Sequence, residues 1–96
     1  MDLEKLRKEL ENDEGKVHTI YKDHLGYLTF GIGHLIVKHD PEYGKEIGTY
    51  VLEHRVIKAF EQDIEIVLSD CNRLYEDFED LPEEVQRVVA NMMFNM

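Results

Sequence analysis

Apolar residues at the start of the chain follow the spacing of an amphipathic helix. Leu3, Leu6 and Leu10 are three and four residues apart, a spacing that places their side chains on one face of an α-helix. Gly15 then favours a stop, because glycine readily takes the left-handed conformation found at helix C-termini. The pattern predicts a helix over residues 2–13.

A strand pattern replaces the helical one directly afterwards. Residues 17–21 and 27–30 are two short runs rich in β-branched and aromatic residues. The five residues between them, 22–26, include a glycine, which is typical of the link in an antiparallel hairpin. The stretch 38–48 is polar and carries one Pro and two Gly, so we expect a loop with at most one more short strand. The pattern predicts a small, three-stranded sheet.

Helical spacing returns in the second half of the chain. Apolar residues recur from Leu52 to Leu74, a stretch long enough for one helix to connect two lobes. After an acidic break at 76–80, the sequence Asp80-Leu81-Pro82-Glu83 offers a cap, an early proline and a capping-box glutamate for a final helix. Its apolar side is expected to comprise Val85, Val88, Val89, Met92, Met93 and Met96. Such a surface needs a partner that covers it.

These elements predict a single α+β domain over residues 1–96. Within it, residues 13–50 would form a β-lobe, residues 51–75 the connecting helix and residues 81–96 the start of a helical lobe. A hydrophobic content of 43% with six Gly and two Pro is typical of a globular protein.

Composition and charge disfavour several classes of function. The chain has 11 Lys and Arg against 21 Asp and Glu, a net charge of −10, which would repel nucleic acid and anionic membrane surfaces. No apolar run approaches the roughly 18 residues that span a bilayer, and no basic-then-apolar leader opens the sequence. We expect a product of the cytoplasm with no nucleic-acid or membrane partner. Cys71 is the only cysteine, and its place on an apolar helical face favours a buried structural thiol over a nucleophile.

Glu14, Asp23 and Thr29 are the candidate catalytic residues. Hydrolysis of an acetal needs an acid that protonates the leaving oxygen and a second carboxylate that activates water or attacks the sugar. The partial negative charge at a helix C-terminus helps Glu14 to stay protonated, whereas Asp23 in a solvated turn should stay ionised. Two carboxylates in such unlike environments fit an acid and a base, although acidic pairs at this spacing are common by chance in so acidic a chain.

The residues around these three carry a more specific pattern. Asp13-Glu14-Gly15, Ile20-Tyr21-Lys22-Asp23 and the run from Gly26 to His34 together resemble the T-even phage lysozymes of glycoside hydrolase family 24. The resemblance continues through Phe60-Glu61-Gln62-Asp63 and through residues 91–96. It implies a lysozyme-like fold in which 51–75 is the interlobe helix.

The resemblance also implies an activity and the roles of individual residues. The enzyme would be a muramidase that hydrolyses the β-1,4 bond between N-acetylmuramic acid and N-acetylglucosamine in bacterial peptidoglycan, with inversion, during host cell lysis. Glu14 would be the general acid, Asp23 would activate the water and Thr29 would help to hold it. The substrate-binding residues implied are Gly33, Leu35, Phe94 and Asn95.

His34 is expected to have a structural role. The resemblance implies an ion pair with Asp63 that ties the sheet to the long helix. The five histidines match no recognised zinc or iron pattern, so we expect neither a metal site nor a cofactor. Phe94 has an ordinary core position as an equal alternative to substrate contact.

Two classes of function stay open. Members of the resembled family are longer, so we expect this chain to lack most of the C-terminal helical lobe and to need a second chain or lobe over its last helix. The first hypothesis is a glycosidase, made in the host cytoplasm, that acts on the glycan strands of the bacterial cell wall. The alternative is a non-catalytic peptidoglycan-binding or scaffold fragment.

Overall fold

The computed structural model describes residues 2–94. Its elements, in chain order, are α1 (Leu3–Glu14), β1 (Val17–Lys22), β2 (Leu28–Gly31), β3 (His34–Leu35), α2 (Glu53–Leu74), the 3-10 turn η1 (Phe78–Asp80) and α3 (Glu83–Phe94). The strands form an antiparallel sheet in the order β1-β2-β3. The predicted α+β class is therefore confirmed.

Helix α1 begins and ends where its sequence provides caps. The Asp2 side chain accepts a hydrogen bond from the Lys5 N–H at the start, which satisfies one of the donors left unpaired at a helix N-terminus. Gly15 ends the helix with a φ of 79°, and its N–H donates to the Glu11 carbonyl at 2.8 Å. The predicted helix is present, shifted by one residue at each end, and Glu14 is its last residue.

The hairpin is also present, and the third strand follows it at once. Asp23 to Tyr27 connect β1 to β2, and Ile32-Gly33 connect β2 to β3. The predicted loop at 38–48 contains no described strand. Beyond it the chain returns to β1 through a single bridge between Thr19 and Tyr50, so the loop lies along one edge of the sheet.

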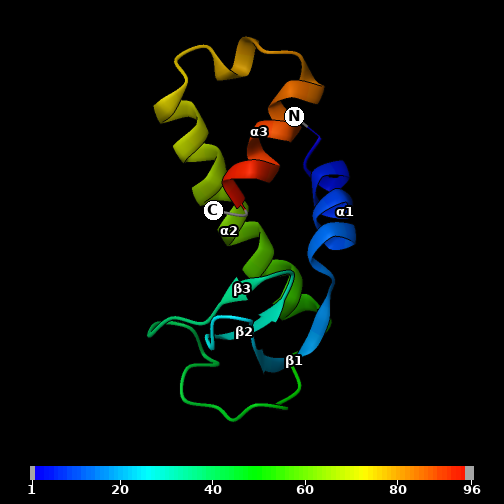
Figure 1. Cartoon of the computed structure of the whole chain (residues 1–96), viewed down its shortest axis with the longest axis vertical. Coiled ribbons are helices and arrows are strands. Elements are labelled where there is room, and N and C mark those ends of the chain that lie inside the picture. Colours follow the sequence, from blue (N-terminus) through cyan, green and yellow to red (C-terminus); the bar gives the residue numbers. More distant parts are fainter. Residues whose placement is uncertain (1, 95–96) are drawn as a thin grey trace.

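Helix α2 runs along the length of a molecule that measures 43 × 23 × 22 Å (Figure 1). The sheet lies near its first turns, and α3 lies beside its later ones. Its buried face comprises Val56, Ala59, Phe60, Ile64, Val67 and Cys71. Cys71 is fully buried as predicted, and burial, then the charge of Asp70, raises the pKa of its thiol. Neither α2 nor any other helix within residues 2–94 is long and apolar enough to cross a membrane.

The predicted apolar side of α3 is only partly correct. Val89 and Met93 pack against the core, but Val85, Val88 and Met92 are 42%, 59% and 64% exposed. The helix instead buries Ala90 and the Arg87 side chain. The apolar residues of α3 form two adjacent stripes along the helix, and only one of these stripes can face the rest of the protein. Met96, the last predicted member, lies outside the described residues.

Candidate active site

Gly33 brings Glu14 and Phe94 together. The Glu14 Oε2 atom lies 3.4 Å, and the Phe94 Cε1 atom 3.8 Å, from the position that a Cβ at residue 33 would occupy. Gly33 also has a φ of 66°, in the left-handed region that glycine adopts without steric cost. The turn between β2 and β3 therefore lets an exposed carboxylate at the end of α1 and an aromatic ring on α3 approach the same point.

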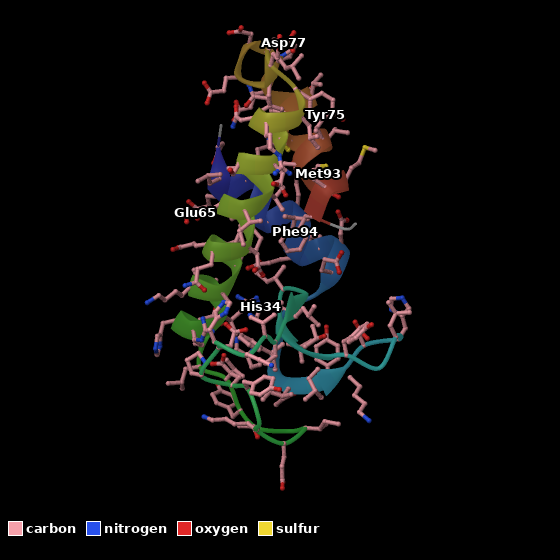
Figure 2. All side chains as sticks on the ribbon, turned by 90° about the vertical axis from the view of Figure 1, so that its left-hand side faces the viewer. His34, Glu65, Tyr75, Asp77, Met93 and Phe94 are labelled. Carbon is pink, nitrogen blue, oxygen red and sulfur yellow. The ribbon has the colours of Figure 1, made fainter. Side chains whose placement is uncertain are left out.

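A hollow of about 670 Å³ extends from this point along α2. Gly33, Leu35 and Phe94, three of the predicted substrate-binding residues, line it, together with α2 residues that include Lys58 and Gln62. Its size is within the usual range of ligand pockets, roughly 300–1,000 Å³. Figure 2 shows Phe94 on α3 above His34, which lies at the sheet end of the molecule. Asn95, the fourth predicted contact, lies outside the described residues.

The three predicted catalytic residues do not line this hollow themselves. Glu14 stands at its edge through its contact with Gly33. Asp23 and Thr29 lie farther along the hairpin, in the β1–β2 turn and on β2. The structure thus brings Glu14 to the hollow, while Asp23 and Thr29 belong to the adjoining sheet surface.

Asp23 stabilises the hairpin turn through hydrogen bonds of its side chain and its backbone. Its Oδ1 atom accepts hydrogen bonds from the N–H groups of Leu25 and Tyr27, both at 2.9 Å. Its own N–H donates to the Tyr27 carbonyl at 2.9 Å. This is an Asx-type turn, a common structural role for aspartate. Because both side-chain bonds use Oδ1, Oδ2 is left to bind a water molecule.

Thr29 occupies the middle of a row that crosses the sheet. It pairs with Tyr21 on β1 and with Leu35 on β3. Directly opposed residues of antiparallel strands point to the same face, so these three side chains share one surface. Thr29 is only 4% exposed, and its Oγ1 atom donates to the Tyr27 carbonyl at 3.1 Å. The hydroxyl oxygen keeps its lone pairs, which can accept a hydrogen bond from water.

Tyr21 is a member of this surface that the sequence analysis did not select. Burial, followed by the charges of Glu14 and Asp23, raises the pKa of its phenol. All three effects favour the neutral phenol. The sequence offered only the proximity of Tyr21 and Asp23 as a signal, because Tyr21 lies near the end of β1 and Asp23 follows the last residue of that strand.

The predicted pairing of His34 with Asp63 is confirmed, and it is half of a larger arrangement. His34 Nδ1 lies 2.7 Å from Asp63 Oδ2, and Nε2 lies 2.8 Å from Asp40 Oδ2. Burial alone would lower the pKa of His34, but the hydrogen bonds and charges of Asp63 and Asp40 outweigh it and raise the pKa. One imidazole thus joins β3, the following loop and α2.

Arg55 extends this network along α2. Its Nε and Nη2 atoms donate to Glu42 at 2.8 and 2.9 Å, and Nη2 also donates to Asp40 at 3.3 Å. Burial would raise the pKa of Asp40, but the Val37 N–H, then His34 and Arg55, lower it. Asp40 and Glu42 are only 8% and 6% exposed. The sequence analysis missed both acids because it assigned them to a polar loop.

No protein-family model matches the chain, and no curated protein matches it. The lysozyme family therefore stays a prediction from the resemblance. Within residues 2–94, no group of three or more His, Cys, Asp and Glu side chains is arranged to hold a metal ion.

Proposed function

We propose that this chain is a muramidase that hydrolyses the β-1,4 glycosidic bond of bacterial peptidoglycan. The observation that carries the proposal is the position of the Glu14 carboxylate against Gly33 and Phe94, at the edge of the hollow. An acid at the rim of a cavity can protonate the linking oxygen of a glycan strand that lies in the cavity. Asp23 and Thr29 supply the water-handling groups on the adjacent sheet surface.

The proposed reaction is a single displacement. Glu14 gives its proton to the glycosidic oxygen as the bond from that oxygen to the anomeric carbon breaks. A water molecule held by Asp23 and the Thr29 hydroxyl attacks the anomeric carbon from the other face, and Asp23 accepts the proton that the water loses. The result is a free reducing end with inverted configuration. Asp23 is suited to this part because the turn fixes Oδ1 and leaves Oδ2 for the water.

The test is the release of new reducing ends from purified peptidoglycan. We expect Glu14→Gln to lower the rate by about 10²-fold or more, the scale of general-acid catalysis, with little change in stability because Glu14 is exposed. Glu65→Gln is a matched control, since Glu65 is an exposed glutamate on α2 that does not line the hollow and lies away from His34, the neighbour of Gly33 in the sequence (Figure 2). Absence of cleavage by the parent chain, or a Glu14→Gln variant within a few-fold of the parent, would overturn the proposal.

A non-catalytic peptidoglycan-binding or scaffold role is the second candidate. It is favoured by the Asp23 Oδ1 hydrogen bonds, which a purely structural aspartate would also make. The exposed Val85, Val88 and Met92 on α3 suit attachment to a second chain or lobe. Co-sedimentation with peptidoglycan without any new reducing ends would support this alternative.

A further inference from the structure

A groove lies between α1 and the first half of α2, and it is separate from the hollow. Its volume is about 470 Å³. No residue that lines the groove also lines the hollow, because the α2 residues of the two cavities belong to different faces of the helix. Figure 2 shows this for Glu65, which lines the groove and lies on the other side of α2 from Phe94, which lines the hollow. A molecule bound in the groove therefore leaves the hollow open.

The floor of the groove is apolar. Phe60 and Ile64 are 2% exposed and belong to the core beneath it, whereas Ile57 is half-buried and Leu3 is 48% exposed. Ile57, Phe60 and Ile64 are three and four residues apart, so they follow one stripe of α2. A row of apolar side chains from a second chain can lie along such a stripe.

The rim of the groove is acidic. Four exposed glutamates line it: Glu4, Glu53, Glu61 and Glu65. Two of them have basic partners within the chain. Glu53 is paired with Lys16 and His18, and Glu4 lies 3.5 Å from Arg7. The charges of these two glutamates are therefore compensated by the fold itself.

Glu61 and Glu65 lack such a partner among residues 2–94, where neither forms an ion pair. Lys58, the basic residue of α2 closest to them in sequence, lines the hollow instead. Because the two glutamates are one helical turn apart, their like charges destabilise α2 when nothing is bound. A positively charged ligand at the groove relieves this repulsion.

We propose that the groove is a docking site for a basic amphipathic helix of a protein partner. The apolar side chains of that helix lie along the α2 stripe, and its Lys or Arg side chains meet Glu61 and Glu65. Nucleic acid and anionic lipid are repelled by the acidic rim. A second copy of this chain carries the same net charge of −10, which opposes association of two copies. The occupant is thus a basic segment of another protein.

A synthetic helical peptide of about four turns, with Leu on one face and Lys on the other, is the probe. We expect it to bind the full chain and to shift the backbone amide NMR signals of the first turn of α1 and of residues 53–65. The signals of β3, at the hollow, should stay unchanged. Replacing each Leu of the peptide by Ser while the Lys residues are kept should raise the Kd about tenfold or more, because the apolar contact with the floor is lost.

Charge reversal at the rim tests the other half of the recognition. At about 150 mM salt, Glu61→Lys should raise the Kd about fivefold or more, since it replaces an attraction by a repulsion. Glu76→Lys is the matched control, because it changes the net charge equally at an exposed position. Residue 76 lies beyond the end of α2, which continues for roughly 14 Å past Glu65. The control should change the Kd by less than about twofold, because the screening length is then about 8 Å.

Several results would overturn the docking site. Equal losses in Glu61→Lys and Glu76→Lys would mean that the peptide responds only to net charge, and equal binding of the Ser peptide would mean that the floor is not used. Amide shifts confined to the hollow or to α3 would place the peptide elsewhere. A dimer of the parent chain in sedimentation velocity that changes with Glu61→Lys would identify a second copy as the occupant. These measurements use no peptidoglycan, so their outcome is independent of the proposed function.

Discussion

Gly33 is the residue on which the proposed site depends most closely. It has a left-handed backbone, and the Glu14 carboxylate lies within van der Waals distance of where its Cβ would be. Gly44 has the same kind of backbone, with a φ of 87°, but nothing lies within 4 Å of where its Cβ would be. Alanine at either position would therefore carry the same backbone strain, but only alanine at position 33 would touch the Glu14 carboxylate.

We predict that Gly33→Ala and Gly44→Ala destabilise the protein to a similar extent, by about 1–2 kcal/mol, the cost of a left-handed alanine. Only Gly33→Ala should lower the rate of peptidoglycan cleavage, by roughly a few-fold, because its methyl group would lie in van der Waals contact with the Glu14 carboxylate and restrict the small movements that align it with the substrate. Urea unfolding and reducing-end assays on both variants check this. Equal activity in the two variants would show that Glu14 does not work from this position.

Single residues also mark the limit of what the sequence could predict about the site. Glu14, Asp23 and Thr29 were selected because a dense local pattern surrounds them. Tyr21 was passed over, since its relevance depends on the strand pairing that sets it opposite Thr29. Asp40 and Glu42 were assigned to a solvated loop, and only the fold shows that Arg55 and His34 draw them inward.

At the scale of elements, strong periodicity predicted the boundaries well. Both α1 and α2 lie within one or two residues of their predicted limits, because each has one clear apolar stripe and a glycine or a break at its end. For α3 the periodicity left two neighbouring stripes, and the structure buries the one that carries Ala90, with Val89 and Met93 packed against the core. The buried face of α3 depends on its contacts with the rest of the fold, so the sequence of this helix alone could not predict it.

The sheet, the loop and α2 are joined by charge as well as by apolar packing. His34 on β3, Asp40 in the loop and Asp63 on α2 form the junction. Folding raises the pKa of His34. The stability that His34 contributes is therefore fully present below its unfolded-state pKa of about 6.5. This contribution is lost as pH rises through the folded-state pKa. Folding lowers the pKa of Asp40. The stability that Asp40 contributes is therefore present above its unfolded-state pKa of about 3.9. This contribution is lost as pH falls through the folded-state pKa.

We therefore predict that the network stabilises the protein most between about pH 4 and 6.5. Asp40→Asn should lower the free energy of unfolding by about 3–5 kcal/mol in that window, the cost of removing one partner from a buried ion pair. The deficit should shrink from pH 5.5 to pH 9, because the contribution of His34 is lost as pH rises through its raised pKa. Chemical denaturation at pH 5.5 and 9 gives both values.

Glu53 provides the contrast for this experiment. Hydrogen bonds from Lys16 and then His18 lower its pKa to about 2, yet the group is exposed to solvent, which screens such pairs. Glu53→Gln should therefore leave the unfolding midpoint nearly unchanged at pH 5.5. A deficit for Asp40→Asn that is no larger than that of Glu53→Gln, or one that grows toward pH 9, would contradict the assigned role of the network.

At the scale of the whole molecule, the net charge of −10 bears on how the proposed enzyme meets its substrate. Part of that charge lies in the acidic segment 76–80, which connects α2 to α3 at the end of the molecule away from the sheet (Figure 1). Bacterial cell walls carry negative charge, so approach of this protein is opposed by long-range repulsion. The repulsion acts on encounter rather than on the chemistry at Glu14.

Ionic strength should then change the rate in the direction opposite to that of a basic lysozyme. Raising salt from 10 to 150 mM shortens the screening length from about 30 Å to about 8 Å, so we predict a rise of roughly threefold or more in the initial rate on intact walls. The double variant Glu76→Lys/Asp77→Lys, altered at the end remote from Gly33, should be faster at low salt and less dependent on salt. Rates on short, soluble glycan fragments should vary less for both proteins, since fewer charges oppose their approach. A rate that falls with salt on intact walls would mean that attractive contacts dominate, and that the acidic surface does not govern encounter.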